Sequence, residues 1–221
     1  MTTLSDESVV YLVPVGAGRF DLYSEPLDVH APIGWLHRLQ ERWREAVHAA
    51  RTAEASAGRI ARARDWAVRR GAEMIAEQRT LWSLRHVAAA TLVHPSDLTE
   101  RAAVDVRDRL LDHARRHHGR WLILDTSLFI LSGAFVLVPG PNVLAYYFAL
   151  RVVGHYLSWR GARQARRRSR WRLRAEPALT ELAGLVDVPR DARASRVDAI
   201  AAALNVPRLA SFFERTAVPA A

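Results

Sequence analysis

The sequence predicts a mostly α-helical protein: an N-terminal β-hairpin, long helices, an apolar helical hairpin of transmembrane character and a small C-terminal helical tail. Apolar residues recur at helical spacing through most of the chain. Two apolar stretches flank a turn of proline, glycine and asparagine at residues 139–142. The expected divisions are the β-hairpin at 1–30, a charged helical region at 35–118, the apolar hairpin at 119–160, and an arginine-rich extension with short helices at 161–221.

The composition limits the chemistry available to the chain. Its formal charge of +9 comes from arginine alone, because the sequence contains no lysine. Arginine binds phosphate in a bidentate manner, so anionic lipid headgroups and nucleic acid are both compatible partners. The absence of cysteine excludes disulfides and thiolate metal sites. The acidic, polar first residues lack the features of a signal peptide, so we expect the N-terminus to stay in the cytoplasm.

The first expected element is the β-hairpin. Residues 9–15 and 19–23 are rich in β-branched and aromatic side chains and flank a Gly-Ala-Gly turn, and the second run alternates polar with apolar residues. The glycines predict a simple turn rather than a phosphate-binding loop, because the glycine spacing and the following helix of such a loop are missing.

The next elements are charged helices. We expect helices at residues 35–52, 59–92 and 98–118, of which the second has an apolar stripe at seven-residue spacing. Such a stripe fits an ordinary bundle face or packing against another chain. Three short helices are expected in the tail, at residues 177–185, 193–204 and 207–215.

The apolar hairpin is the most distinctive feature. Its arms, at residues 121–138 and 143–159, each hold about 18 residues, or about 27 Å of helix, which is near the lower limit for crossing a bilayer. The first arm has eleven Leu, Ile, Phe or Val residues, together worth roughly −5 kcal/mol of insertion free energy, and should insert. The second has seven, worth roughly −3 kcal/mol, against about +3 kcal/mol for Arg151, so it should need the first arm.

Arginines indicate the orientation of this hairpin. They cluster before the first arm and after the second, so the positive-inside rule places both termini in the cytoplasm and the turn on the far side. These arginines are Arg115, Arg116, Arg120, Arg160, Arg163, Arg166, Arg167 and Arg168. We expect them to contact anionic lipid headgroups.

Antiparallel pairing of the two arms places Asp125 level with His155 and puts Arg151 about one helical turn deeper. One reading is a proton-responsive Asp125–His155 pair, because imidazole titrates near neutrality; the other is a structural ion pair or side chains that reach the interface. His113 and His117 share a helix face, but no partner motif completes a metal site. No hydrolase elbow, Walker loop or paired-carboxylate signature occurs, so we expect neither enzyme activity nor a cofactor.

Between residues 138 and 163, polar and aromatic motifs follow one another in a fixed register. They are Pro141-Asn142, Tyr146-Tyr147-Phe148, Arg151, His155 and Gly161-Ala162-Arg163. In this stretch the sequence resembles the mitochondrial potassium/proton exchange-related family, which also has bacterial members. Residues 11–23 also resemble the start of that family. Leu144 and Tyr156 depart from the pattern, since family members usually have a proline and a tryptophan there.

The resemblance implies an integral membrane protein linked to monovalent cation (potassium)/proton homeostasis, at the bacterial inner membrane. Its candidate functional residues are Pro141, Asn142, Arg151 and His155, joined by Asp125 through the pairing of the arms. One hairpin offers too few helices for a monomeric alternating-access pathway. We therefore expect an accessory protein, a regulator or an oligomeric component, with a homo-oligomer or a membrane protein as partner. The alternative is a peripheral or soluble arginine-rich helical protein that binds anionic lipid or nucleic acid, nucleic acid being the less expected ligand.

Overall fold

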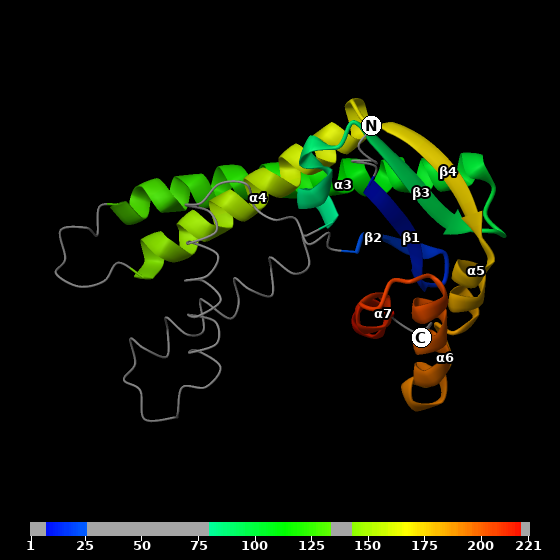
Figure 1. Cartoon of the computed structure of the whole chain (residues 1–221). Coiled ribbons are helices and arrows are strands. Elements are labelled where there is room, and N and C mark those ends of the chain that lie inside the picture. Colours follow the sequence, from blue (N-terminus) through cyan, green and yellow to red (C-terminus); the bar gives the residue numbers. More distant parts are fainter. Residues whose placement is uncertain (1–7, 26–79, 134–142, 218–221) are drawn as a thin grey trace, which may run out of the picture. The chain divides into compact units, whose positions relative to one another are not determined.

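The computed structural model describes residues 8–25, 80–133 and 143–217 (Figure 1). The chain forms two compact units. The first contains Met1–Pro26, Thr80–Arg115 and Arg160–Ala221, and the second contains Leu27–Arg79 and Arg116–Trp159. The helix expected at 35–52, most of the one at 59–92, and the turn with Pro141 and Asn142 lie outside the described residues, so these stay predictions.

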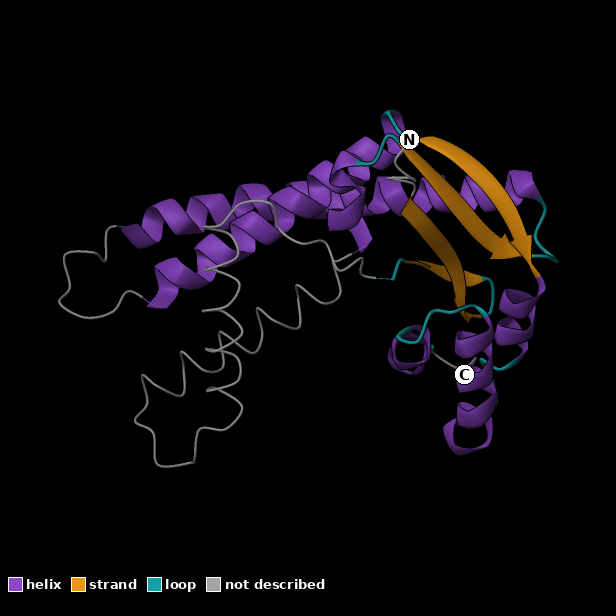
Figure 2. Ribbon diagram, in the orientation of Figure 1, coloured by secondary structure: helices purple, strands orange, loops and turns teal. Residues whose placement is uncertain are grey.

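The first unit is built on a four-stranded sheet in the order β2-β1-β3-β4 (Figure 2). The predicted N-terminal hairpin is confirmed, because β1 (Ser8–Gly16) pairs antiparallel with β2 (Arg19–Tyr23). Gly18 in the connecting turn has φ +65°, a conformation that glycine adopts at little cost. The hairpin is thus one edge of a larger sheet.

The two other strands were not expected from the sequence. The prediction of a helix as far as residue 92 is wrong, since a 3₁₀ turn at Leu84–His86 is followed by β3 (Ala89–Pro95), which runs parallel to β1. The predicted arginine-rich extension contains β4 (Arg170–Glu176), parallel to β3. Both segments become strands because their backbones complete a sheet ladder with distant residues, which outweighs local helix preference.

One face of the sheet packs against the three C-terminal helices. Side chains of β1 and β3, including Val13 and Val93, share a core with α5 (Pro177–Gly184), α6 (Arg190–Ala203) and α7 (Leu209–Thr216). All three short helices of the tail are therefore confirmed. Alternate residues of a strand point to the same side of the sheet, so the apolar side chains of this face pack together against the helices.

A buried arginine links α6 to α7. Arg193 of α6 is 5% exposed and donates from Nε and Nη2 to the two carboxylate oxygens of Glu214 in α7, at 3.0 and 2.9 Å. Its Nη1 donates to the Val186 carbonyl at 2.8 Å. The guanidinium is fully paired, as a buried charge must be.

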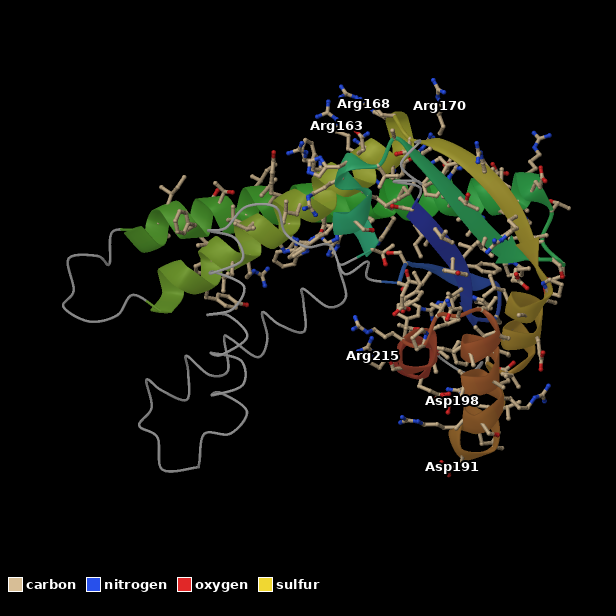
Figure 3. All side chains as sticks on the ribbon, viewed as in Figure 1. Arg163, Arg168, Arg170, Asp191, Asp198 and Arg215 are labelled. Atoms are coloured by element: carbon tan, nitrogen blue, oxygen red, sulfur yellow. The ribbon has the colours of Figure 1, made fainter. Side chains whose placement is uncertain are left out.

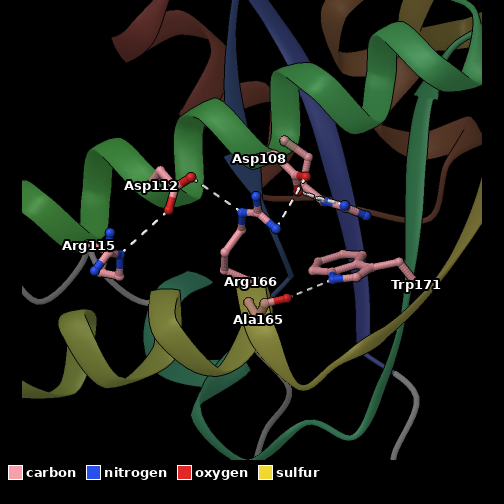
Figure 4. Close-up of polar contacts among 7 residues, drawn as sticks. Asp108, Asp112, Arg115, Ala165, Arg166 and Trp171 are labelled. Carbon is pink, nitrogen blue, oxygen red and sulfur yellow. Dashed lines mark hydrogen bonds and ion pairs between the residues drawn. The ribbon is translucent and has the colours of Figure 1, made fainter.

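The other face of the sheet packs against the beginning of α3 (Glu100–Gly133) and the end of α4 (Val143–Arg167). Figure 4 shows the polar contacts of these helices: Arg166 lies 3.5 Å from Asp108 and 3.4 Å from Asp112, and Trp171 Nε1 donates to the Ala165 carbonyl at 2.9 Å. The ion pairs are part-exposed and worth little individually. Apolar burial therefore dominates this contact.

Both long helices differ from the predicted segments. The helix expected at 98–118 and the arm beginning at residue 121 form one continuous helix, α3, and α4 continues past the expected end of the second arm to Arg167. In the part of the chain that the structure describes, no helix is both long and apolar enough to cross a membrane. The prediction of transmembrane arms is thus not supported by these residues.

Candidate functional site: a buried charge cluster in the helical hairpin

The second unit brings three of the predicted site residues into contact. Asp125 of α3 is 1% exposed, and its two carboxylate oxygens face different residues of α4. Arg151 Nε lies 2.9 Å from Oδ1, and His155 Nε2 lies 3.3 Å from Oδ2. The antiparallel register expected from the sequence places the three groups as found.

Arg151 is held on several sides. Besides the hydrogen bond to Asp125, its Nη1 donates to the Tyr147 hydroxyl at 3.2 Å. Its guanidinium carbon lies 5.2 Å from the centre of the Trp121 ring, a cation–π distance. Burial lowers the pKa of Arg151, but the hydrogen bonds to Asp125 and Tyr147 and the charge of Asp125 outweigh it and raise the pKa overall. The Arg151 guanidinium therefore stays charged.

The pKa of His155 is shifted in the opposite direction. Burial lowers its pKa below the ordinary 6.5; the charge of Asp125 opposes this, and Arg151 and His117 reinforce it. The 3.3 Å separation from Asp125 is within ion-pair reach, yet no hydrogen bond joins the two atoms. Neither His155 Nε2 nor Asp125 Oδ2 has a hydrogen-bond partner among the described residues. The cluster therefore holds a neutral imidazole next to an incompletely satisfied carboxylate.

A second histidine extends the cluster. His118 of α3 is 8% exposed, and its Nδ1 lies 2.8 Å from His155 Nδ1. One ring must donate and the other accept at this contact. If both rings are neutral, donation from His118 leaves the proton of His155 on Nε2, where it faces Asp125. The reverse tautomer would point a lone pair at the carboxylate, so the first arrangement is favoured.

His118 was not predicted as a site residue. It belongs to a run of basic residues that indicates a solvated surface, yet it precedes Asp125 by seven positions, which places both on one face of a helix. That spacing was the available signal. Pro141 and Asn142, the other two candidates, lie outside the described residues.

The surface around this buried cluster is apolar. Large hydrophobic side chains of the second unit are 38–72% exposed, although such residues are normally buried. They are Trp121, Ile123, Leu124, Phe129, Ile130, Leu131, Leu150, Val153 and Tyr156. Large apolar side chains exposed in such number on two neighbouring helices are a candidate interaction surface.

The imidazole rings of the cluster can bind and release a proton. Asp125 and Arg151 balance each other, so a proton added to the histidines would carry the net charge of the site. The described residues include no group of three histidine, cysteine, aspartate or glutamate side chains arranged to hold a metal ion. Proton binding is the chemistry that the geometry favours.

The fold and the site define a small α/β protein with a helical hairpin that buries ionisable groups. A family model described as mitochondrial K⁺-H⁺ exchange-related matches residues 31–167, more than half of the chain, and the chain belongs to this family. The match includes His118, Asp125, Arg151 and His155, whereas residues 11–23, which also resemble the family, lie outside it. No curated protein and no solved structure matches the chain.

Proposed function

We propose that the protein is a non-enzymatic component of monovalent cation (potassium)/proton homeostasis, bound to the bacterial inner membrane with both chain ends on the cytoplasmic side. It acts as an accessory protein, a regulator or an oligomeric component rather than as a complete exchanger. Membership of the K⁺-H⁺ exchange-related family supports this role.

The contacts among His118, His155 and Asp125 are the main support for the proposal. Buried ionisable groups are costly and are retained mainly where they serve structure or function. Here an imidazole of lowered pKa contacts a carboxylate that already pairs with Arg151. Gain of a proton at His155 would strengthen its attraction to Asp125 and increase its repulsion from Arg151. The hairpin could therefore report local pH through the strength of the Asp125–Arg151 pair.

The apolar surface of the second unit supports membrane attachment. Exposed side chains such as Ile123, Ile130 and Leu131 would lose unfavourable contact with water by entering lipid. Arg116 and Arg120 on the same stretch of α3 are exposed and would meet anionic headgroups. The same surface would serve oligomerisation or a membrane partner protein.

Everted membrane vesicles test the cation/proton role. Vesicles from cells that contain the chain and from cells that lack it are acidified inside by respiration, and the dissipation of the gradient on addition of potassium is followed with a pH-sensitive dye. We expect a larger potassium-dependent dissipation when the chain is present. Asp125→Asn should reduce it, whereas Asp198→Asn, which removes an exposed carboxylate of α6, should not. Identical dissipation with and without the chain would contradict the proposal.

Extraction of the same membranes with alkaline carbonate tests the attachment. Retention of the chain in the pellet supports lipid-embedded apolar contacts, because carbonate disrupts electrostatic association but not apolar insertion. Complete release into the supernatant would favour the alternative, a peripheral arginine-rich protein that binds anionic lipid or nucleic acid. Steep weakening by salt would then be expected, since phosphate contacts release counterions.

A further inference from the structure

The strand β4 forms one edge of the sheet in the first unit (Figure 1). It pairs with β3 along all seven of its residues, and in the part of the chain that the structure describes the sheet order ends with β4. Four of the seven residues are exposed, among them Ala175, whose small side chain leaves the backbone accessible. An exposed strand edge is a template on which another extended segment can pair.

The direction of the backbone groups in β4 follows from its pairing with β3. The N–H of Arg170 donates to the Ala88 carbonyl at 2.9 Å, so the backbone of Arg170 faces inward, toward the rest of the sheet. Successive residues of a strand direct their N–H and C=O groups to opposite sides. The N–H and C=O groups of Trp171, Leu173 and Ala175 therefore point outward, where an added strand would meet them.

The two faces of β4 differ in chemical character. Trp171 and Leu173 are half-buried against the core that includes α3 and α4, and Trp171 Nε1 donates to the Ala165 carbonyl at 2.9 Å. The alternating positions, on the other face, are exposed arginines: Arg170, Arg172 and Arg174. Figure 3 shows Arg170 at the start of the strand, directed away from the sheet. At about 3.3 Å per residue, the three arginines are spread along about 13 Å of the edge.

These arginines determine which kind of segment can be added. Two copies of β4 paired about a two-fold axis place arginine opposite arginine in each register that pairs most of the two strands, and like charges directly opposite are destabilising. A strand with carboxylates at alternate positions instead places opposite charges at cross-strand positions about 4.5–5.5 Å apart at Cβ. Apolar residues between those carboxylates would lie beside Trp171 and Leu173. The edge therefore fits a segment in which acidic and apolar residues alternate.

We propose that the outer edge of β4 binds an extended acidic segment of a partner protein by strand addition. The backbone of that segment pairs with the outward groups of Trp171, Leu173 and Ala175, which supplies affinity. Its carboxylates lie beside the arginines of β4, which supplies selectivity for an acidic sequence. The interaction goes beyond the proposed cation/proton role and is independent of it, because it uses residues of the first unit and none of the buried charge cluster.

A synthetic peptide that alternates glutamate with valine tests this edge on the full chain without any substitution. Hydrogen exchange detected by NMR should show increased protection at the amides of Trp171, Leu173 and Ala175 when the peptide is added. The amides of Arg172 and Arg174 already face β3 and should change less. Uniform protection of all five amides, or of none, would overturn the proposal.

Methylation of alternate backbone nitrogens of the peptide separates strand pairing from charge attraction. One peptide is methylated on its glutamate nitrogens and the other on its valine nitrogens, and only one of these sets faces β4 in an added strand. Fluorescence polarisation should therefore show a loss of affinity of about tenfold or more for one peptide and a much smaller loss for the other. Equal affinities would mean that no strand is added and would overturn the proposal.

Substitution of the arginines tests the charge pairing. Arg170→Gln should weaken peptide binding about two- to fivefold, the effect of one exposed ion pair, and addition of Arg172→Gln should weaken it further. Arg215→Gln is the matched control and should leave the affinity nearly unchanged, since it removes the same charge from an exposed position on α7 (Figure 3). Equal effects of the Arg170 and Arg215 substitutions would overturn the proposal.

Two other occupants of the edge are distinguished in the same series. Dimerisation of the chain that the peptide does not reverse would assign the edge to a second copy. If Arg170→Gln weakened binding to vesicles that contain phosphatidic acid but not to the peptide, the arginines would serve a lipid surface. Either result would overturn the proposal. No ion flux is measured, so this proposal can fail while the cation/proton role holds, and the reverse.

Discussion

Replacement of Asp125 by asparagine removes one buried negative charge and keeps the shape of the side chain. In the structure this carboxylate is 1% exposed and lies 2.9 Å from Arg151 Nε, and the side chain of Arg151 is 19% exposed. Removal of one partner from a buried ion pair costs about 3–5 kcal/mol, because the other charge stays buried without compensation. Arg151 keeps its hydrogen bond to Tyr147 and some access to water. We therefore expect the lower end of the range, about 3 kcal/mol.

Hydrogen exchange of backbone amides measures this locally. A loss of about 3 kcal/mol corresponds to roughly a hundredfold decrease in protection, which we expect in peptides from residues 116–133 and 143–159. The protection of peptides from the first unit should change little. Asp198→Asn, the exposed control on α6, should leave protection in both regions unaltered. In a second step, Arg151→Met in the Asp125→Asn background should cost less than the sum of the single substitutions, because it removes the unpaired charge.

Two outcomes would refute this reasoning. The first is a change in protection below about threefold for Asp125→Asn, which would mean that the ion pair contributes no more than a surface pair. The second is strict additivity of the two substitutions, which would mean that Asp125 and Arg151 do not interact energetically.

Three further predictions concern both units. Gly161→Ala should destabilise the first unit by about 1–3 kcal/mol in urea denaturation, because the added Cβ meets backbone that cannot rotate away. Gly184→Ala is the control and should be neutral or slightly stabilising, since nothing lies within 4 Å of the added carbon. Equal effects of the two substitutions would contradict the packing argument. Arg193→Met should cost about 3 kcal/mol, the lower end of the range for a broken buried pair, because Glu214 keeps its contact with the exposed Arg190. Arg196→Met, in an exposed pair, should cost less than about 1 kcal/mol. Because the pKa of His155 is lowered on folding, its contribution to stability is present above pH 6.5 and diminishes as the pH falls below it, since the unfolded chain binds the proton first. His155→Gln should therefore reduce the pH dependence of the urea midpoint between neutral and mildly acidic pH, and an unchanged dependence would count against a buried neutral imidazole.

Local patterns predicted the N-terminal hairpin and the C-terminal helices, because turn residues and helical periodicity can be recognised within a short stretch of sequence. They failed for β3, where the apolar spacing of the preceding segment continues as far as Leu92 and imitates a helix. What makes Ala89–Pro95 a strand is parallel pairing with β1 and β4, each about eighty residues away in sequence. In β4, by contrast, the alternation of arginines with Trp171 and Leu173 was a strand signal, obscured by the abundance of arginine.

The site could be predicted from the sequence more completely than the sheet. Antiparallel arms of known spacing placed Asp125, Arg151 and His155 at similar depth without reference to tertiary structure. The role of His118 was obscured because it is one of several adjacent basic residues, and charge runs usually face solvent. Its burial depends on continuation of α3 through Gly119, which the division into two separate segments did not anticipate.

The proposed function depends most on proton binding by the cluster of His118, His155 and Asp125. Imidazole nitrogen NMR of the full chain across pH, with and without Asp125→Asn, tests it most directly. We expect His155 to titrate below 6.5, and its pKa to fall further in the variant, because the charge of Asp125 favours the protonated ring. A His155 pKa at or above 6.5, or one that the loss of Asp125 leaves unchanged, would contradict the account.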